Sequence, residues 1–159
     1  MLVFLIGFMG AGKTTLGNAL AQQLGWRFID LDHEVMQFSG HSVSELFALK
    51  GESGFRQVEQ RVLQNVIHPF QDLASGVKNG IIACGGGTPC YAQNLALIKA
   101  SGFVIYLEAS PEILSERLLR TPTTIRPILP PQEPQQQLLF IRNLLDKRRP
   151  FYEAAHWKC

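Results

Sequence analysis

The sequence predicts an α/β fold built on a central parallel β-sheet, and three observations support this. Short unbroken apolar runs at residues 2–6, 81–84 and 103–107 are typical of strands that are covered on both faces. Segments with helical periodicity lie between these strands, beginning with residues 13–24. A chain of 159 residues is long enough for one substantial core, so residues 1–159 are expected to form a single domain.

The remaining elements follow from local signals. Residues 26–31 alternate in polarity and predict another strand, which ends in acidic residues. In residues 32–65 the pattern is helical in pieces: Ser42 or Ser44 can cap a first helix, and Gly51 can end it. The other predicted helices are a segment that carries Phe55, Val58, Val62 and Val66, a short one near 95–100, one that begins at Ser110-Pro111-Glu112, and one at about 134–149.

Composition argues against several classes of function. Hydrophobic residues make up 46% of the chain, the net charge is only +2, and the basic residues form no stripe, so no nucleic-acid partner is expected. The apolar run at 2–6 is too short for a membrane span or a signal peptide. The three cysteines lack the spacing of a zinc site or a redox pair, which favours reduced thiols in a cytoplasmic protein.

The strongest motif joins the strand at 2–6 to the helix at 13–24. Residues 7–14, GFMGAGKT, match G-x-x-x-x-G-K-[ST] in full, in the strand–turn–helix setting that this phosphate-binding P-loop requires. Its glycines let backbone N–H groups point at phosphate oxygens. The alternative, a chance glycine-rich turn before a helix, would not explain the complete motif in this setting. Nucleotide contacts are expected from Gly10, Ala11, Gly12, Lys13, Thr14 and Thr15. Lys13 would reach the β- and γ-phosphates, and the Thr14 hydroxyl would reach Mg²⁺.

Two carboxylates follow the strand at 26–31. Asp30 and Asp32 are two residues apart, and residues at that spacing in extended backbone face the same way, so both could converge above the sheet edge. One could hold the Mg²⁺ hydration shell while the other accepts a hydrogen bond from a substrate hydroxyl. The alternative is an acidic helix start, because Asp32 and Glu34 also suit a helix N-terminus.

An arginine with a nearby acid comes next, in Gly51-Glu52-x-x-Phe55-Arg56-x-x-Glu59. A guanidinium can donate two parallel hydrogen bonds to a carboxylate, which lysine cannot imitate. Glu59 lies three residues after Arg56, on the same helix face, and could hold that guanidinium in place. An ordinary surface ion pair is the alternative.

Three consecutive glycines, Gly85, Gly86 and Gly87, follow the strand at 81–84. A turn needs one or two glycines, so close approach of a ligand to bare backbone would account for three. The strand carries no terminal acid, which leaves Asp30 as the better candidate for the metal side.

Farther on, residues 121–134 hold five prolines and few packing residues, and they fit either a disordered linker or an active-site lid at about 120–134.

Taken together, these motifs resemble the shikimate kinase family from residue 2 to about residue 155. The set comprises GFMGAGKTT, Asp30-Leu31-Asp32, GE-x-x-FR-x-x-E, GGG, Arg126-Pro127-Ile128-Leu129 and Arg148-x-Pro150-x-Tyr152, in the family's order and spacing. The resemblance implies a three-layer α/β/α P-loop kinase fold with a parallel sheet in the order 2-3-1-4-5. It also implies a substrate-binding helical region at about 32–66. The family continues past a last strand, which HWKC could begin, so its later adenine loop and terminal helix have no counterpart here.

The resemblance further implies ATP and shikimate as substrates, Mg²⁺ as cofactor, and a cytoplasmic monomer with no membrane partner. Asp32 would orient or deprotonate the shikimate hydroxyl, and Asp30 would act with Thr14 on the metal side. Residues expected to bind shikimate are Asp32, Phe47, Phe55, Arg56, Gly85, Gly86, Gly87 and Arg148. Arg126 would close over the phosphates with the lid, and Arg120 would lie near adenine. Another small-metabolite kinase, such as a gluconate-type enzyme, and a non-catalytic ATP-binding module remain alternatives.

Overall fold

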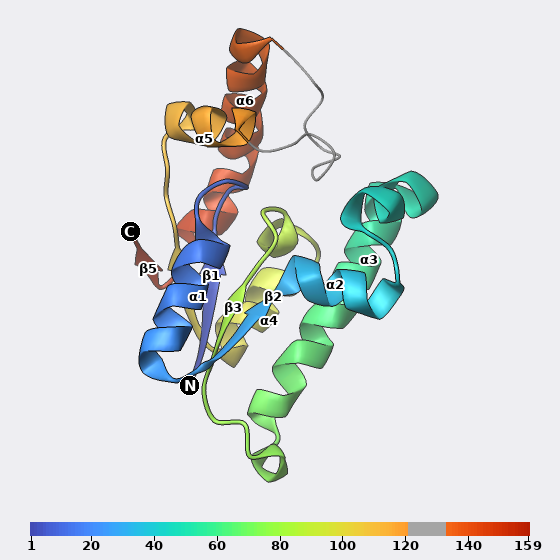
Figure 1. The fold of residues 1–159 in the computed structure, drawn as a ribbon, viewed down its shortest axis with the longest axis vertical. Coiled ribbons are helices and arrows are strands. Elements are labelled where there is room, and N and C mark those ends of the chain that lie inside the picture. The colour runs from blue at the N-terminus through green and yellow to red at the C-terminus, as the bar shows by residue number, and fades with distance from the viewer. Residues whose placement is uncertain (121–132) are drawn as a thin grey trace.

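The protein is described by a computed structural model over residues 1–120 and 133–159 (Figure 1). Five parallel strands form one sheet in the order β2-β3-β1-β4-β5, which confirms the predicted order. The strands are β1 (Leu2–Ile6), β2 (Arg27–Asp30), β3 (Gly80–Ala83), β4 (Phe103–Tyr106) and β5 (Trp157–Lys158). The helices are α1 (Lys13–Leu24), α2 (Leu31–Ser39), α3 (Val43–Gln71), α4 (Asn94–Ser101), α5 (Pro111–Leu119) and α6 (Pro134–Glu153), with short 3₁₀ turns η1 (Leu73–Ser75) and η2 (Thr88–Cys90).

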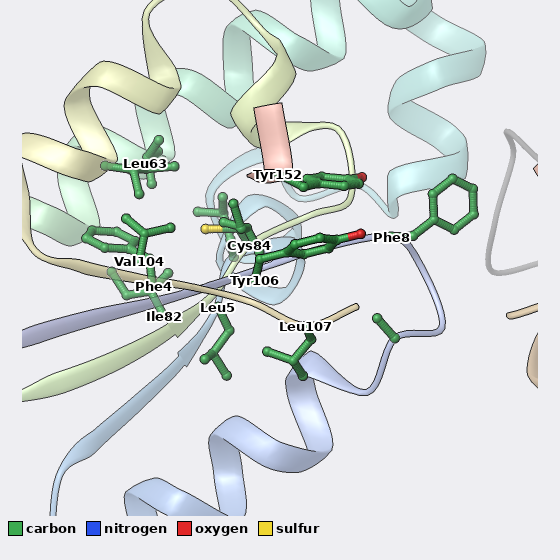
Figure 2. Packing of buried hydrophobic residues seen from close by; sticks show 14 of the residues in the cluster. Phe4, Leu5, Phe8, Leu63, Ile82, Cys84, Val104, Tyr106, Leu107 and Tyr152 are labelled. Carbon is green, nitrogen blue, oxygen red and sulfur yellow. The ribbon is translucent and has the colours of Figure 1, made fainter. Parts of the chain in front are cut away.

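The core is centred on β1, whose five residues are all buried. Phe4 pairs in register with Ile82 on β3 and with Val104 on β4, so three apolar side chains meet in the middle of the sheet. Figure 2 shows α1 on one side of the strands and Leu63 of α3 on the other. Central parallel strands need such cover on both faces, and this explains their unbroken apolar sequence.

The buried residues of helix α1 that face the core include two small ones, Gly17 and Ala21. Leu16 and Leu24 are exposed and Leu20 is partly buried against the core, whereas Gly17 and Ala21 are buried. A Cβ atom at Gly17 would lie 2.7 Å from the Phe28 ring, so only glycine permits this close approach. The periodicity of this segment therefore predicted the helix but not which of its residues lie closest to the sheet.

Several element boundaries differ from the sequence prediction. Strand β2 stops at Asp30 because that carboxylate caps α2. Of the two predicted caps of α3, it is Ser42 that fills this role, in a capping box with Glu45. Gly51 breaks the helical geometry (φ 67°, ψ −179°), yet the chain resumes the same helix as far as Gln71. Helix α6 was expected to end near residue 149, but it runs through Pro150 to Glu153.

The extension of α6 matters for the site, because Arg148 and Tyr152 thereby lie one turn apart on its buried face. Among the helices of residues 1–120 and 133–159, none has the length and apolar character needed to span a bilayer.

Candidate active site

A cavity of about 1050 Å³ opens at the carboxyl ends of β1, β2 and β3. Open parallel sheets bind their ligands at this edge, because the loops that leave the strands converge there. The lining includes these predicted site residues: Gly10, Ala11, Gly12, Lys13, Thr14, Thr15, Asp30, Asp32, Phe47, Phe55, Arg56, Gly85, Gly86, Gly87 and Arg148. Segments from the loop after β1 to α6 thus bring together residues that are up to 139 positions apart in the sequence, from Met9 to Arg148.

The P-loop follows β1 and leads into α1. Gly10 (φ 82°) and Gly12 (φ 97°) adopt left-handed backbone, which favours glycine at both positions. Helix α1, which is described in full, begins without a side-chain cap and without an acid in its first turn. Its first backbone N–H groups and its positive dipole end are therefore available to an anion such as a phosphate.

Lys13 lies inside this loop rather than in solvent. Its ammonium donates to the carbonyl oxygens of Gly7 and Phe8, each at 2.9 Å, and the residue is only 9% exposed. These bonds hold a positive charge directly beside the backbone N–H groups of the loop. The cradle therefore combines a fixed cation with several neutral donors, which is the chemistry that a polyphosphate needs.

The Thr14 hydroxyl donates to Asp30 Oδ2 at 2.7 Å, so the two predicted metal-side residues are in direct contact. Their adjacent oxygen atoms fit Mg²⁺, which commonly takes one or two protein oxygens together with substrate phosphates and water. Within the described ranges, no group of three or more His, Cys, Asp or Glu side chains could hold a metal alone. The donor set therefore fits a metal ion that is shared with a bound nucleotide.

For Asp30 and Asp32 the sequence allowed either two carboxylates at the sheet edge or an acidic helix start, and each hypothesis is partly correct. Asp30 does cap a helix, since its Oδ1 accepts the backbone N–H groups of Asp32 (3.1 Å) and His33 (3.3 Å). Asp32 is therefore helical and not extended, and the argument from strand geometry was wrong. Both carboxylates nevertheless line the cavity, because the first turn of α2 begins at its edge.

The surroundings of Asp32 raise its pKa to about 6. Restricted hydration is the largest cause, followed by repulsion from Glu59 and from Asp30, while Lys13 and Arg56 oppose the shift. The side chain still has accessible surface because it faces the open cavity, and the walls around it are what limit its hydration. Such a carboxylate is a better proton acceptor than an ordinary aspartate.

Arg56 and Glu59 are not a surface ion pair. Arg56 is 6% exposed and Glu59 is fully buried, and Nη1 donates to Oε2 at 2.7 Å. Phe55 packs on Phe47 with ring centroids 4.6 Å apart, and the Arg56 guanidinium lies 5.1 Å from the Phe55 ring. Aromatic contact and the buried acid therefore fix this guanidinium in the cavity wall.

Arg148 reaches the same cavity from α6. Its guanidinium lies 5.7 Å from the centre of the Phe8 ring, and the residue is 7% exposed. In the described part of the chain, its buried Nη1 has no hydrogen-bond partner. A buried donor of this kind is costly unless a ligand satisfies it, so Arg148 is suited to bind an anion.

The three turn glycines make room for side chains of the protein itself. A Cβ at Gly85 would lie 2.8 Å from Glu59 Oε1 and 2.9 Å from Asp32 Oδ1. At Gly86 it would lie 3.3 Å from Arg148 Nη1, and at Gly87 it would overlap Arg56, 2.5 Å from Cζ. The sequence argument attributed these glycines to a ligand alone, whereas the functional side chains already occupy the space.

Three residues near the site, Thr88, Tyr152 and Arg117, were missed as functional candidates, and Glu59 was predicted only as the partner of Arg56. Glu59 lines the cavity, and Thr88 donates to Glu59 at 2.7 Å. Tyr152, fully buried and stacked on Tyr106, donates to the Gly86 carbonyl at 2.5 Å. Arg117 lines the cavity and donates to the Gly10 carbonyl at 3.1 Å. Of the three, only Tyr152 stands in one of the recognised motifs, so only that residue could have been indicated by the sequence.

The roles of two arginines, Arg120 and Arg126, stay predictions. Arg120 is exposed and pairs with Glu116 at 2.7 Å, so its adenine contact stays a prediction. Arg126 and most of the expected lid at about 120–134 lie outside the described residues.

Comparison with known proteins assigns the family. A family model described as Shikimate kinase matches residues 9–159. The shikimate kinase of Azobacteroides pseudotrichonymphae is 40% identical over 153 residues, which cover 96% of this chain and 85% of the relative. The crystal structure of a shikimate kinase from Bacteroides thetaiotaomicron superposes with a TM-score of 0.87 at 38% identity, and the match covers 99% of this chain and 85% of that one. A shikimate kinase from Acinetobacter baumannii in complex with shikimate gives a TM-score of 0.85 at 37% identity, over 99% and 82%.

These matches span nearly the whole chain and confirm the resemblance drawn from the motifs. The chain therefore belongs to the shikimate kinase family of ATP-dependent kinases.

Proposed function

We propose that this chain transfers the γ-phosphate of ATP to the 3-hydroxyl of shikimate. The observation that carries the proposal is a single cavity lined by a P-loop, by two buried arginines, Arg56 and Arg148, and by Asp32. A P-loop alone is shared by many phosphate-binding proteins. The arginines add a site for a carboxylate, and the aspartate adds a proton acceptor for a hydroxyl, which together describe a small hydroxy acid.

On the nucleotide side, the backbone N–H groups of residues 10–15 bind the phosphates. Lys13 exchanges its two carbonyl contacts for phosphate oxygens, and this change requires little movement because the ammonium already lies in the loop. Thr14 and Asp30 would hold Mg²⁺, which supplies charge stabilisation when bound. Arg117 adds a further positive charge beside Gly10, and Arg126 is expected to complete the phosphate contacts from the lid.

On the acceptor side, the guanidinium groups of Arg56 and Arg148 bind the shikimate carboxylate. Phe47 and Phe55 form an apolar wall for the ring, and the turn at 85–87 offers backbone groups to its hydroxyls. Asp32 accepts the proton of the shikimate 3-hydroxyl. The oxygen of that hydroxyl forms a bond to the γ-phosphorus while the bond between the γ-phosphorus and ADP breaks. Cations placed around the transferring group stabilise its spread negative charge.

A coupled assay of ADP release tests this function. The intact chain with ATP and Mg²⁺ is expected to release ADP when shikimate is added, and ³¹P NMR should show a new phosphate monoester. Gluconate serves as the competing acceptor, since a gluconate-type kinase would also combine a P-loop with a lid. Turnover with gluconate but not with shikimate would replace the proposed acceptor. Nucleotide binding without turnover on any acceptor would indicate an ATP-binding module.

Replacing the clamp arginines is expected to weaken shikimate binding selectively. Lysine keeps the charge of Arg56 or Arg148 but cannot donate two parallel hydrogen bonds. We expect Arg56→Lys and Arg148→Lys to raise the KM for shikimate roughly 10-fold to 100-fold, with a much smaller change in the KM for ATP. Steady-state kinetics with both substrates varied measures the two constants separately.

Arg142→Lys is the matched control for these variants. Arg142 is also on α6, but it is exposed, pairs with Glu112 at 2.7 Å and does not line the cavity. Its replacement is expected to leave both KM values unchanged. If shikimate affinity were unchanged in both clamp variants as well, the carboxylate site would have to lie elsewhere.

We also propose that the enzyme is a cytoplasmic monomer. ATP as phosphoryl donor and the three free thiols of Cys84, Cys90 and Cys159 support a reducing compartment.

A further inference from the structure

A buried chain of hydrogen bonds connects the glycine turn to one of the clamp arginines. The Thr88 hydroxyl donates to Glu59 Oε1 at 2.7 Å, and Arg56 Nη1 donates to Glu59 Oε2 at 2.7 Å. Each oxygen of the carboxylate thus receives one of these bonds. The order of the three side chains runs from Thr88 on η2, through Glu59 on α3, to Arg56 at the cavity.

Burial makes both bonds important to the position of Glu59. Thr88 and Glu59 are fully buried, so neither the Thr88 hydroxyl nor the Glu59 carboxylate can exchange its partner for bulk water. A buried carboxylate oxygen without a donor is costly, and the side chain would turn to find another. Because Arg56 is bound to the other oxygen of the same carboxylate, a rotation of Glu59 would disturb the hydrogen bond that orients the guanidinium.

Thr88 is itself held by the backbone around it. Its N–H donates to the Gly85 carbonyl at 3.1 Å, and its own carbonyl accepts from Asn94 Nδ2 at 3.0 Å. A Cβ at Gly85 would approach the Thr88 hydroxyl to 3.0 Å, so the turn closes tightly over it. The hydroxyl therefore has a fixed position from which it can define the orientation of Glu59.

We propose that Thr88 is a positioning residue for shikimate binding, which acts through Glu59 to set the direction of the Arg56 guanidinium. The inference rests on the proposed function, because shikimate is the ligand whose carboxylate Arg56 would bind. Thr88 does not line the cavity, so its effect on the substrate is exerted through the hydrogen-bond chain and not by contact.

A purely structural role for Thr88 makes a different prediction. Loss of a buried hydrogen bond anywhere in the core lowers the melting temperature without selecting between the two substrates. A positioning role raises the KM for shikimate and leaves the KM for ATP unchanged, because the P-loop is not part of the chain of bonds. The ratio of the two constants therefore separates the roles.

The experiment compares Thr88→Val, which keeps the shape but removes the hydroxyl, with Thr88→Ser, which keeps the hydroxyl. Thr88→Val is expected to raise the KM for shikimate roughly 10-fold to 100-fold, whereas Thr88→Ser retains a value close to that of the unmodified chain. Ser115→Ala is the control for loss of another buried hydroxyl. Ser115 bonds to Gln137 at 3.3 Å outside the cavity lining, and its removal is expected to change neither KM.

Calorimetric titration with shikimate and with ADP, together with the melting temperature of each variant, completes the test. Thr88→Ala, which is smaller, replaces Thr88→Val if the valine variant does not fold. Equal shikimate affinity in the folded hydroxyl-free variant and the unmodified chain would overturn the inference alone. Absence of shikimate binding and turnover in the unmodified chain would instead overturn the proposed function, and this inference with it.

Discussion

Asp32→Asn is expected to lower kcat by about 100-fold to 10,000-fold, the range typical of losing a general base. Asparagine keeps the shape of the side chain but cannot take up the proton of the acceptor hydroxyl. The carboxylate is suited to this role because its surroundings raise its pKa to about 6 and because it lines the cavity between the P-loop and Arg56. Affinity for ADP should stay unchanged, since the loop contacts are intact.

The matched control is Asp146→Asn, which removes an exposed carboxylate that pairs with Arg149 at 3.4 Å and is absent from the cavity lining. Steady-state kinetics on shikimate and calorimetry with ADP should show full activity in that variant. If Asp32→Asn retained kcat within a few-fold, proton transfer would not depend on this side chain, and the assignment of the base would be withdrawn.

Lys13→Ala is expected to reduce turnover by at least about 100-fold to 1000-fold, because one preorganised positive charge at the transferring phosphate is lost. The ammonium is nearly buried within the loop that would bind ATP. Nucleotide affinity should fall together with kcat, in contrast to Asp32→Asn. Single-turnover assays and ADP titrations measure the two effects independently.

Lys99→Ala is a close control for this variant, because Lys99 also donates from its ammonium to a backbone carbonyl, that of Ala154 at 2.7 Å. It is exposed and does not line the cavity, so activity should be retained. Melting temperatures of both variants distinguish a damaged loop from a missing charge. Normal turnover in a folded Lys13→Ala protein would contradict the proposed phosphate site.

Local signals in the sequence were sufficient for most of the fold. The apolar run at 2–6 and the motif at 7–14 each define their own structure, and the observed β1 and α1 agree with both. Asp32 shows where such reasoning fails. Its inclusion in the site was predicted from strand geometry, but the Asp30 cap turns the chain into a helix one residue earlier. A cap depends on a side-chain contact, which the alternation of polarity does not report.

Contacts between distant segments were beyond local signals. Thr88 and Glu59 are 29 positions apart, and nothing in either segment indicates that they meet in a buried bond. The leucines of α1 show the same limit, because periodicity cannot tell that Gly17 must face Phe28. The roles of Arg120 and Arg126 stay predictions, since Arg120 lies outside the cavity lining and Arg126 outside the described residues.

The turn at residues 85–87 has a consequence for how the acceptor site can evolve. A Cβ atom added at one of these glycines would meet Asp32 and Glu59, Arg148 or Arg56. A mutation to any larger residue there would disturb proton transfer or carboxylate recognition at once, so the turn offers no gradual route to a new acceptor. Adaptation to other hydroxy acids would have to begin at lining residues outside this turn, such as Met36 on α2.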